Sequence, residues 1–98
     1  MKIVFAHKRL ALIHTPKAHE LGLPFAIIKG AREKLIFLAE APDERTIRNW
    51  KSLNYKKREG TKNDERQIRI NGQYRIIFTI DTESVPPVIT ITEIGDPH

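Results

Sequence analysis

The sequence predicts a small α+β domain in which helical segments pack on one face of a small β-sheet. Residues 67–80 (QIRINGQYRIIFTI) contain two alternating, β-branched runs on either side of Asn71-Gly72, a dipeptide typical of β-hairpin turns. Residues 24–40 carry apolar side chains at helical spacing, and residues 88–94 (VITITEI) alternate as a strand does. A chain of 98 residues is long enough for one domain, which we expect to span residues 1–98.

The register of the hairpin decides which face of the sheet each side chain occupies, because a slip of one residue reverses the faces. A two-residue turn would mix Arg75 with isoleucines on one face, whereas a three-residue connection over residues 71–73 pairs Ile68 with Ile76. We expect the second register, since burying an unpaired guanidinium is costly. Arg75 then stands mid-sheet, either in a binding surface or in an exposed salt bridge. The apolar face consists of Ile68, Ile70, Tyr74, Ile76, Phe78 and Ile80, and the other face of Arg69, Arg75, Ile77 and Thr79.

The other elements follow from local signals. Residues 2–6 predict a first strand, residues 7–14 one or two helical turns, and residues 15–23 a loop. Pro24 suits the first turn of the helix over residues 24–40, and Pro42 ends it. Residues 43–50 predict a short helical turn capped by Asp43, and residues 81–87 a second turn. The side chains expected to face the core from these segments are Leu10, Leu12, Ile13, Phe25, Ile28, Leu35, Leu38 and Ala39.

Side chains of the final strand are expected to alternate between the two faces of the sheet as far as the C-terminus. This alternation places Ile89 and Ile91 in the core, under the helix that covers the hairpin. The residues expected on the face of Arg75 are Thr90, Thr92, Ile94 and Asp96.

The composition narrows the classes of function. Seventeen basic and twelve acidic residues, with a pI near 9.7, favour a polyanionic partner. The absence of cysteine excludes thiol catalysis and the common zinc patterns, and no nucleotide-binding, HExxH or GxSxG motif is present. We therefore expect no metal or other cofactor. No segment has the apolar run of a signal peptide or a membrane span, so we expect a cytoplasmic protein that does not contact the membrane.

A basic segment precedes the hairpin. Trp50 and Tyr55 are interleaved with basic residues between positions 48 and 62, where Glu59 is the single acid. Such a pattern can neutralise phosphates and stack bases, although a solvated loop anchored by Trp50 is the alternative. The candidate RNA-binding residues are Lys51, Lys56, Arg58, Lys62 and Arg69.

The C-terminus supplies candidate catalytic groups. Asp96 and His98 follow the final strand, on the face assigned to Arg75. A carboxylate, an imidazole and a guanidinium on one surface can cleave RNA without a metal: a base takes the 2′-OH proton, an acid protonates the leaving oxygen, and the arginine stabilises the phosphate. A frayed tail without a role is the alternative.

The chain resembles the HigB group of the RelE/ParE superfamily of toxins from bacterial type II toxin-antitoxin systems. The resemblance rests on IRINGQYRIIF (residues 68–78), on Gly60 eight residues before Ile68, and on the ending EIGDPH. It implies a RelE-like fold, with N-terminal helices on a mainly antiparallel twisted sheet. The implied activity is a hydrolytic one, that of an endoribonuclease that cuts mRNA at the ribosomal A site and so inhibits translation.

The resemblance also assigns roles by position. It implies that Arg75 stabilises the scissile phosphate, that Asp96 is the acid near the C-terminus and that His98 is the terminal histidine. This chain has Pro97 where the group has tyrosine, and Glu59 where the group often has lysine, so Lys57 or Lys62 would supply that cation. The implied partners are the ribosome, mRNA and a HigA-like antitoxin with a helix-turn-helix domain. The toxin itself is expected to contact DNA only indirectly, through this antitoxin. The alternatives are a ParE-like gyrase poison and a non-catalytic module that binds RNA or a partner.

Overall fold

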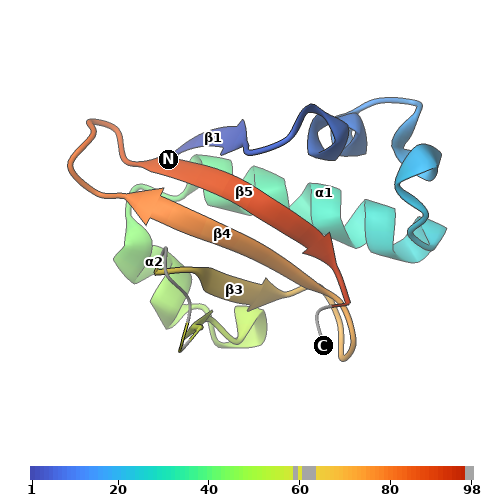
Figure 1. The fold of residues 1–98 in the computed structure, drawn as a ribbon. Helices are drawn as coiled ribbons and strands as arrows, with labels where there is room; N and C mark the ends of the chain where they lie inside the picture. The colour runs from blue at the N-terminus through green and yellow to red at the C-terminus, as the bar shows by residue number, and fades with distance from the viewer. Residues whose placement is uncertain (59, 61–63, 97–98) are drawn as a thin grey trace.

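The computed structural model describes residues 1–58, 60 and 64–96 of the chain. Its described residues form a five-stranded sheet of order β1-β5-β4-β3-β2 (Figure 1). The strands are β1 (Lys2–Phe5), β2 (Lys56–Lys57), β3 (Arg66–Arg69), β4 (Arg75–Asp81) and β5 (Val88–Gly95). All neighbouring pairs are antiparallel except β1 and β5, which are parallel. The predicted mixed α+β fold is confirmed.

Helices cover one face of this sheet, and α1 runs behind it in Figure 1. The chain order is η1 (Lys8–His14), η2 (Ala18–Leu21), α1 (Phe25–Glu40), α2 (Glu44–Asn49) and η3 (Lys51–Leu53), where η denotes a 3-10 helix. The cap predicted for α2 is present, because the Asp43 carboxylate accepts a hydrogen bond from the Thr46 amide at 3.0 Å. The predicted loop over residues 15–23 contains η2. Among the described residues, no helix is both long and apolar enough to cross a lipid bilayer.

The core lies between α1 and the sheet. Ile28, Leu35 and Leu38 of α1 are buried there, as predicted. Phe25 is 78% exposed and Ala39 is also exposed, so the prediction that they face inward is wrong. At 100° per residue, Phe25 lies roughly 110° from the centre of the buried stripe, which explains its exposure. The sheet contributes Ile68, Ile76, Phe78, Ile89 and Ile91, all fully buried.

The hairpin has the predicted three-residue connection. Ile68 lies opposite Ile76, and the Ile70 amide donates to the Tyr74 carbonyl at 2.9 Å. The Asn71 side chain accepts from the Gln73 and Tyr74 amides at 2.8 Å each, which closes the turn. Arg75 is therefore outside the core, although it is the first residue of the central strand and not in the middle of it.

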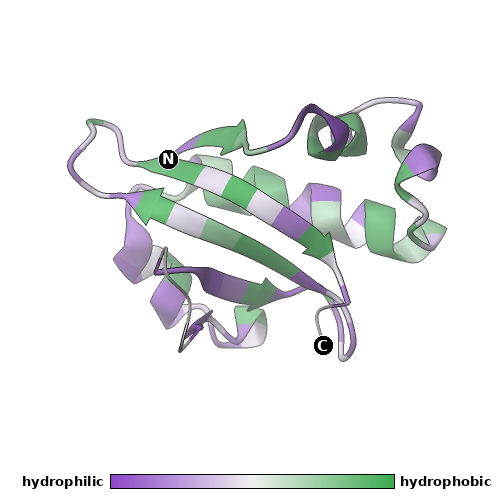
Figure 2. Cartoon of the chain, viewed as in Figure 1, coloured by the Kyte–Doolittle hydropathy of each residue, from purple (hydrophilic) through white to green (hydrophobic). Residues whose placement is uncertain are grey.

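A β-bulge changes the expected faces of the last strand. The register between β4 and β5 shifts between Ile77, opposite Glu93, and Phe78, opposite Ile91, so Thr92 is the extra residue. A bulge of one residue reverses the alternation beyond it. Ile94 is consequently buried in the core, and its predicted place beside Arg75 is wrong. Figure 2 shows the resulting stripes of apolar and polar residues along β4 and β5.

Candidate functional site

The sheet face opposite α1, here called the open face, carries two polar rows. Residues that pair across neighbouring strands point to the same side of a sheet. Arg69, Arg75 and Gly95 therefore form one row at the hairpin end of the sheet. The next row consists of Lys56, Gln67, Ile77 and Glu93.

Arg75 lies over the hairpin turn. Its Nη1 donates to the carbonyls of Asn71 at 2.6 Å and of Tyr74 at 3.0 Å, and its Nη2 donates to that of Gly72 at 3.3 Å. A guanidinium has five N–H donors, so two remain after these three bonds. Within the described part of the chain, no carboxylate forms an ion pair with Arg75. Backbone carbonyls therefore hold the Arg75 guanidinium in place, and no acid among the described residues neutralises its charge.

Space is left open beside Arg75. Gly95 lies directly opposite it on β5 and has no side chain. A Cβ atom built at Gly95 would meet no heavy atom of the described residues within 4 Å, apart from its own chain neighbours. The row that contains Arg75 therefore has an open position on its β5 side, where a ligand group can approach the sheet.

Asp96 lies near Arg75, but not because of the alternation of side chains along β5 from which this was predicted. The bulge removes the parity argument that put it on the face of Arg75. Asp96 instead accepts a hydrogen bond from Gln73 Nε2 at 2.8 Å, which attaches it to the turn that Arg75 also binds. His98, like Lys62, lies outside the described residues.

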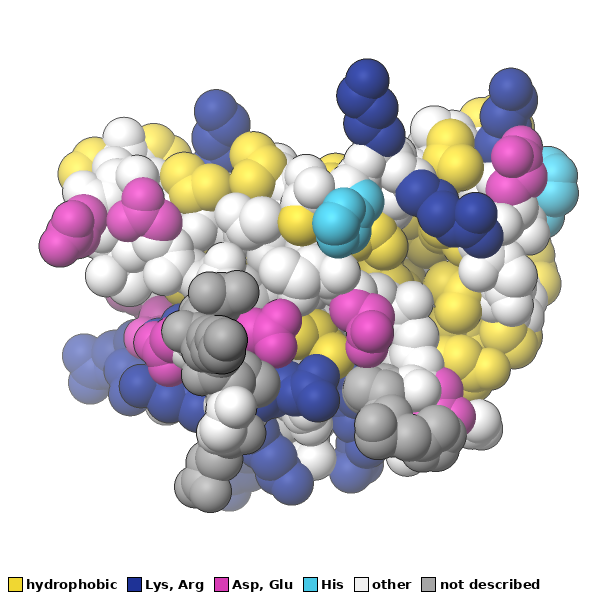
Figure 3. Space-filling model, viewed as in Figure 1, with side chains coloured by type: hydrophobic (Ala, Val, Ile, Leu, Met, Phe, Trp, Pro, Cys, Tyr) yellow, Lys and Arg dark blue, Asp and Glu magenta, His cyan; other side chains and the backbone are white. Residues whose placement is uncertain are grey.

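The basic segment divides between the two sides of the sheet. Lys56 pairs with Gln67 and faces the open side, while Lys57 pairs with Arg66 and faces the helical side. The cation next to the row of Arg75 is thus Lys56, and Lys57 points away from it. The Arg58 amide binds the carbonyl of Glu65 at 2.8 Å beyond them. In Figure 3 dark-blue side chains gather along the lower edge of the open face, over β2, β3 and α2. Lys51 lies in η3, and Arg69 is exposed on the open face.

The two aromatic residues of the basic segment differ in their contacts and exposure. Trp50 packs on Phe37 of α1 with ring centroids 4.9 Å apart and stays 51% exposed. Tyr55 donates its hydroxyl to Glu44 and contacts Phe78 of the core, with ring centroids 6.4 Å apart. Tyr55 is thus occupied inside the protein, and we no longer expect it to stack on a base.

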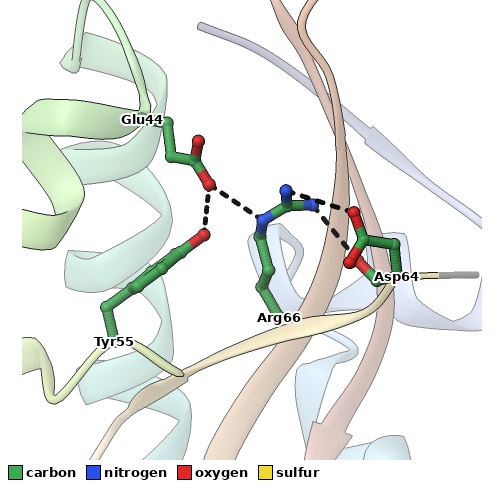
Figure 4. Close-up of polar contacts among 4 residues, drawn as sticks. All are labelled: Glu44, Tyr55, Asp64 and Arg66. Atoms are coloured by element: carbon green, nitrogen blue, oxygen red, sulfur yellow. Dashed lines mark hydrogen bonds and ion pairs between the residues drawn. The ribbon is translucent and has the colours of Figure 1, made fainter. Parts of the chain in front are cut away.

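An ionic cluster around the buried Arg66 fixes the basic segment to the sheet (Figure 4). Arg66 of β3 donates from Nε to the Glu44 carboxylate at 2.9 Å, and the Tyr55 hydroxyl donates to the same oxygen atom. Arg66 also donates to the Asp64 carbonyl at 3.1 Å and lies 3.3 Å from its carboxylate. The cluster therefore joins α2, the start of β2 and the start of β3.

The cluster shifts the pKa values of its members. Burial opposes ionisation of Glu44, but the Tyr55 hydrogen bond and the Arg66 charge outweigh it and lower the pKa of Glu44. Burial and the hydrogen bond to Glu44 both raise the pKa of Tyr55. Burial alone would lower the pKa of Arg66, but the neighbouring Tyr55, Glu44 and Asp64 raise it.

This cluster was missed from the sequence, although a signal for it exists. Arg66 has the parity of Ile68, which puts it on the apolar face of the hairpin. A buried arginine needs a carboxylate partner. That requirement points to an acid on the covering layer, and Glu44 of α2 fills it.

No metal site accompanies these residues. Over residues 1–58, 60 and 64–96, no three His, Asp or Glu side chains are grouped so as to hold a metal ion. A shallow cavity of about 250 Å³ lies at the start of α1, lined by Pro16, Ala18, His19, Phe25, Ile28 and Arg32. None of the residues of the open face lines it.

Comparison with solved structures identifies the fold. A YoeB/ParE toxin from Agrobacterium tumefaciens aligns over 100% of both chains, with a TM-score of 0.57 at 8% identity. The YoeB-YefM complex from Staphylococcus aureus gives a TM-score of 0.57 at 16% identity, covering 100% of this chain and 98% of that chain. The YoeB dimer from the same organism gives 0.54 at 16% identity with the same coverage. No protein-family model matches the chain, and no curated protein sequence does. The fold is therefore that of the RelE/YoeB toxins.

Proposed function

We propose that this protein is the toxin of a type II toxin-antitoxin system and a ribosome-dependent, metal-independent mRNA endoribonuclease. The observation that carries the proposal is the surroundings of Arg75: a guanidinium with two N–H donors left, beside the open position at Gly95. An arginine with this freedom can hold two oxygens of a phosphodiester. The fold shared with YoeB/ParE toxins and the HigB-like hairpin sequence support the same function.

The charge of the open face supports RNA as the substrate. Arg69 lies directly across from Arg75, and Lys56 begins the next row. Cations arranged in this way bind successive phosphates of a single strand. We assign RNA binding to Lys56 and Arg69, with Lys51, Arg58 and Lys62 along the same basic segment.

The catalytic assignments keep the groups expected from the sequence, with one change. Arg75 stabilises the charge that develops on the phosphate, Asp96 acts from the end of β5 beside the hairpin turn, and His98 keeps the role that the resemblance implies. Lys56 replaces Lys57 as the second cation, because Lys57 has the parity of the helical face. No metal or cofactor takes part in this scheme.

The proposal includes two partners. The ribosome presents the mRNA, and a HigA-like antitoxin with a helix-turn-helix domain holds the toxin inactive and binds DNA. A solved YoeB-YefM complex from Staphylococcus aureus, in which the YoeB chain has the same fold, supports a protein partner for this chain. Both partners belong to the cytoplasm.

Controlled induction in bacteria tests the function. We expect the parent to stop incorporation of labelled amino acids within minutes and to produce new mRNA 5′ ends, mapped by primer extension. Arg75→Ala and deletion of His98 are expected to restore growth, with Lys29→Ala of α1 as the control that stays toxic. Unchanged toxicity of both site variants would contradict the assigned site.

The same experiment distinguishes the proposed nuclease from a ParE-like gyrase poison. This alternative is considered because one of the similar structures is described as a YoeB/ParE toxin. Gyrase poisoning produces a DNA-damage response while translation continues. That outcome, with no new mRNA 5′ ends, would replace the nuclease by a gyrase poison. Normal growth under strong induction, with salt-sensitive RNA binding by the purified protein, would point to a non-catalytic module.

A further inference from the structure

We propose that Glu93 is the base that accepts the 2′-OH proton during RNA cleavage, and that the β-bulge places it there. This inference rests on the proposed nuclease function and adds a residue to its site. The sequence alone gave no reason to select Glu93, because strict alternation from Ile89 puts it on the core face.

The bulge brings Glu93 to the open face. Ile91 and Ile94 on either side of it are both buried in the core, although they are three residues apart. Only the extra residue Thr92 makes this possible, and it leaves Glu93 opposite Ile77. The Thr92 hydroxyl donates to the Ile77 carbonyl at 3.1 Å, which fastens the bulge to β4. Bulges of this kind often redirect a side chain next to an active site.

Glu93 is close to the proposed phosphate position. It lies one row from Arg75, diagonally across β4 and β5. Diagonal neighbours in an antiparallel pair are about 7 to 8 Å apart, within reach of long side chains. Gly95 lies opposite Arg75 and two residues from Glu93 on the same face of β5, and it has no side chain to cover the surface there. Glu93 is itself exposed, so a bound ribose can reach it.

The other carboxylates that the structure describes near this face, Asp96 and Glu65, are held by protein groups. Asp96 accepts from Gln73 Nε2 at 2.8 Å in the turn. Glu65 Oε2 lies 3.2 Å from the Thr92 hydroxyl, whose one hydrogen it shares with the Ile77 carbonyl, and Glu65 precedes β3, farther from Arg75 along the strands. Glu93 therefore fits the role of a proton acceptor better than either.

The reaction then balances without a co-reactant. The Glu93 carboxylate takes the proton from a ribose 2′-OH as its oxygen forms a bond to the adjacent phosphorus. The bond from phosphorus to the 5′ oxygen breaks, and that oxygen receives a proton from an acid of the site or from water. The products are a 2′,3′-cyclic phosphate and a free 5′-OH. Arg75 stabilises the extra negative charge between these two events.

Single-turnover cleavage of mRNA on purified ribosomes tests the role. We expect Glu93→Gln to cleave about 100-fold more slowly, within the range for loss of a general base, and Glu93→Asp to recover part of the rate. A 2′-O-methyl RNA of the same sequence, which cannot be cleaved, should bind Glu93→Gln as tightly as the parent or more tightly, since a negative charge is removed. Glu83→Gln, in the β4–β5 turn, is the matched control and should cleave at the parental rate.

The outcomes separate the two proposals. Cleavage by the parent and by Glu93→Gln at equal rates would overturn the role of Glu93 and leave the nuclease function intact. If Glu93→Gln cleaved slowly and its affinity for the 2′-O-methyl RNA fell by the same factor, the role of Glu93 as the base would also be overturned. Glu93 would then contribute to RNA binding. Failure of the folded parent to cleave under any ribosome complex would overturn both proposals. In urea unfolding, a midpoint equal to that of the parent shows that a variant retains the fold.

Discussion

At the scale of single residues, Arg66 and Arg75 show how one side chain type takes two roles in one hairpin. Arg66 faces the helices and is neutralised by Glu44 and Asp64. Arg75 faces the open side and bonds to backbone carbonyls, which carry no net charge. The parity of each position along its strand decides whether the arginine is neutralised against the helices or lies on the open face.

Glu44→Gln tests the structural arginine. Removing Glu44 leaves the charge of the buried Arg66 without its main partner, and Asp64 compensates part of it, so we expect a loss of about 1 to 3 kcal/mol in the free energy of unfolding at pH 7. The pKa of Glu44 is lowered in the folded state, so this stability is present above the ordinary glutamate pKa of 4.5 and is lost as pH falls through the lower folded value. Urea unfolding at pH 7 and pH 3 should show the gap to the parent narrowing in acid. Glu83→Gln should stay within about 0.5 kcal/mol of the parent at both pH values, and an equal gap at the two pH values would contradict the account.

Gly95→Ala tests the open position beside Arg75. Apart from its chain neighbours, the methyl group meets no atom of the described residues within 4 Å, so we expect the unfolding midpoint to stay at the parental value. It occupies the space assigned to the phosphate, so binding of a 2′-O-methyl RNA should weaken several-fold in a fluorescence anisotropy titration. Unchanged binding would show that RNA does not approach β5 at this position.

At the scale of elements, the sequence predicted those whose signals are local. The three-residue hairpin connection followed from Arg75 and the isoleucines around it, α1 from its spacing and prolines, and the start of α2 from Asp43. The bulge at Thr92 depends on how β5 packs against β4, and no turn residue marks it in the sequence. Because the bulge was not predicted, Ile94 was expected on the wrong face of the sheet. The short strand β2 was missed because only two residues pair.

The close approach of α1 to the hairpin gives an element-scale prediction. A Cβ atom at Gly30 would lie 3.0 Å from Ile70 Cγ2, so this helix position faces the end of β3. We expect Gly30→Leu to overpack the contact and to lower the free energy of unfolding by about 1 to 3 kcal/mol. Lys29→Leu, at the exposed neighbouring position, should change it by less than about 0.5 kcal/mol. Equal effects of the two substitutions in urea unfolding would contradict the proposed packing.

At the scale of the whole molecule, the sheet separates a packed layer from a charged one. The net charge of +5 was evident from the sequence, but its placement was not. It depends on the pairing of β2 with β3, which turns Lys56 to the open face and Lys57 to the helices. The parallel pairing of β1 with β5 likewise joins residues from opposite ends of the chain, which no local pattern predicts.

This distribution predicts the salt dependence of RNA binding. Each cation that contacts a phosphate of a single strand contributes about 0.7 to the slope of log affinity against log salt. We expect Lys56→Ala and Arg69→Ala each to reduce the slope for a 2′-O-methyl RNA by about that amount. Lys29→Ala, on α1 behind the sheet, should leave the slope unchanged. A similar reduction in all three variants would mean that RNA binding follows overall charge and not the open face.

The most direct test of the account is to map bound RNA on the protein by NMR. In a titration of the ¹⁵N-labelled protein with a 2′-O-methyl RNA, we predict that the amide signals of Arg69, Arg75, Glu93 and Gly95 shift together. The amide signals of α1 should stay in place, because the helix lies behind the sheet. Shifts confined to α1, with the four signals of the open face unmoved, would contradict the assignment of this face as the RNA site.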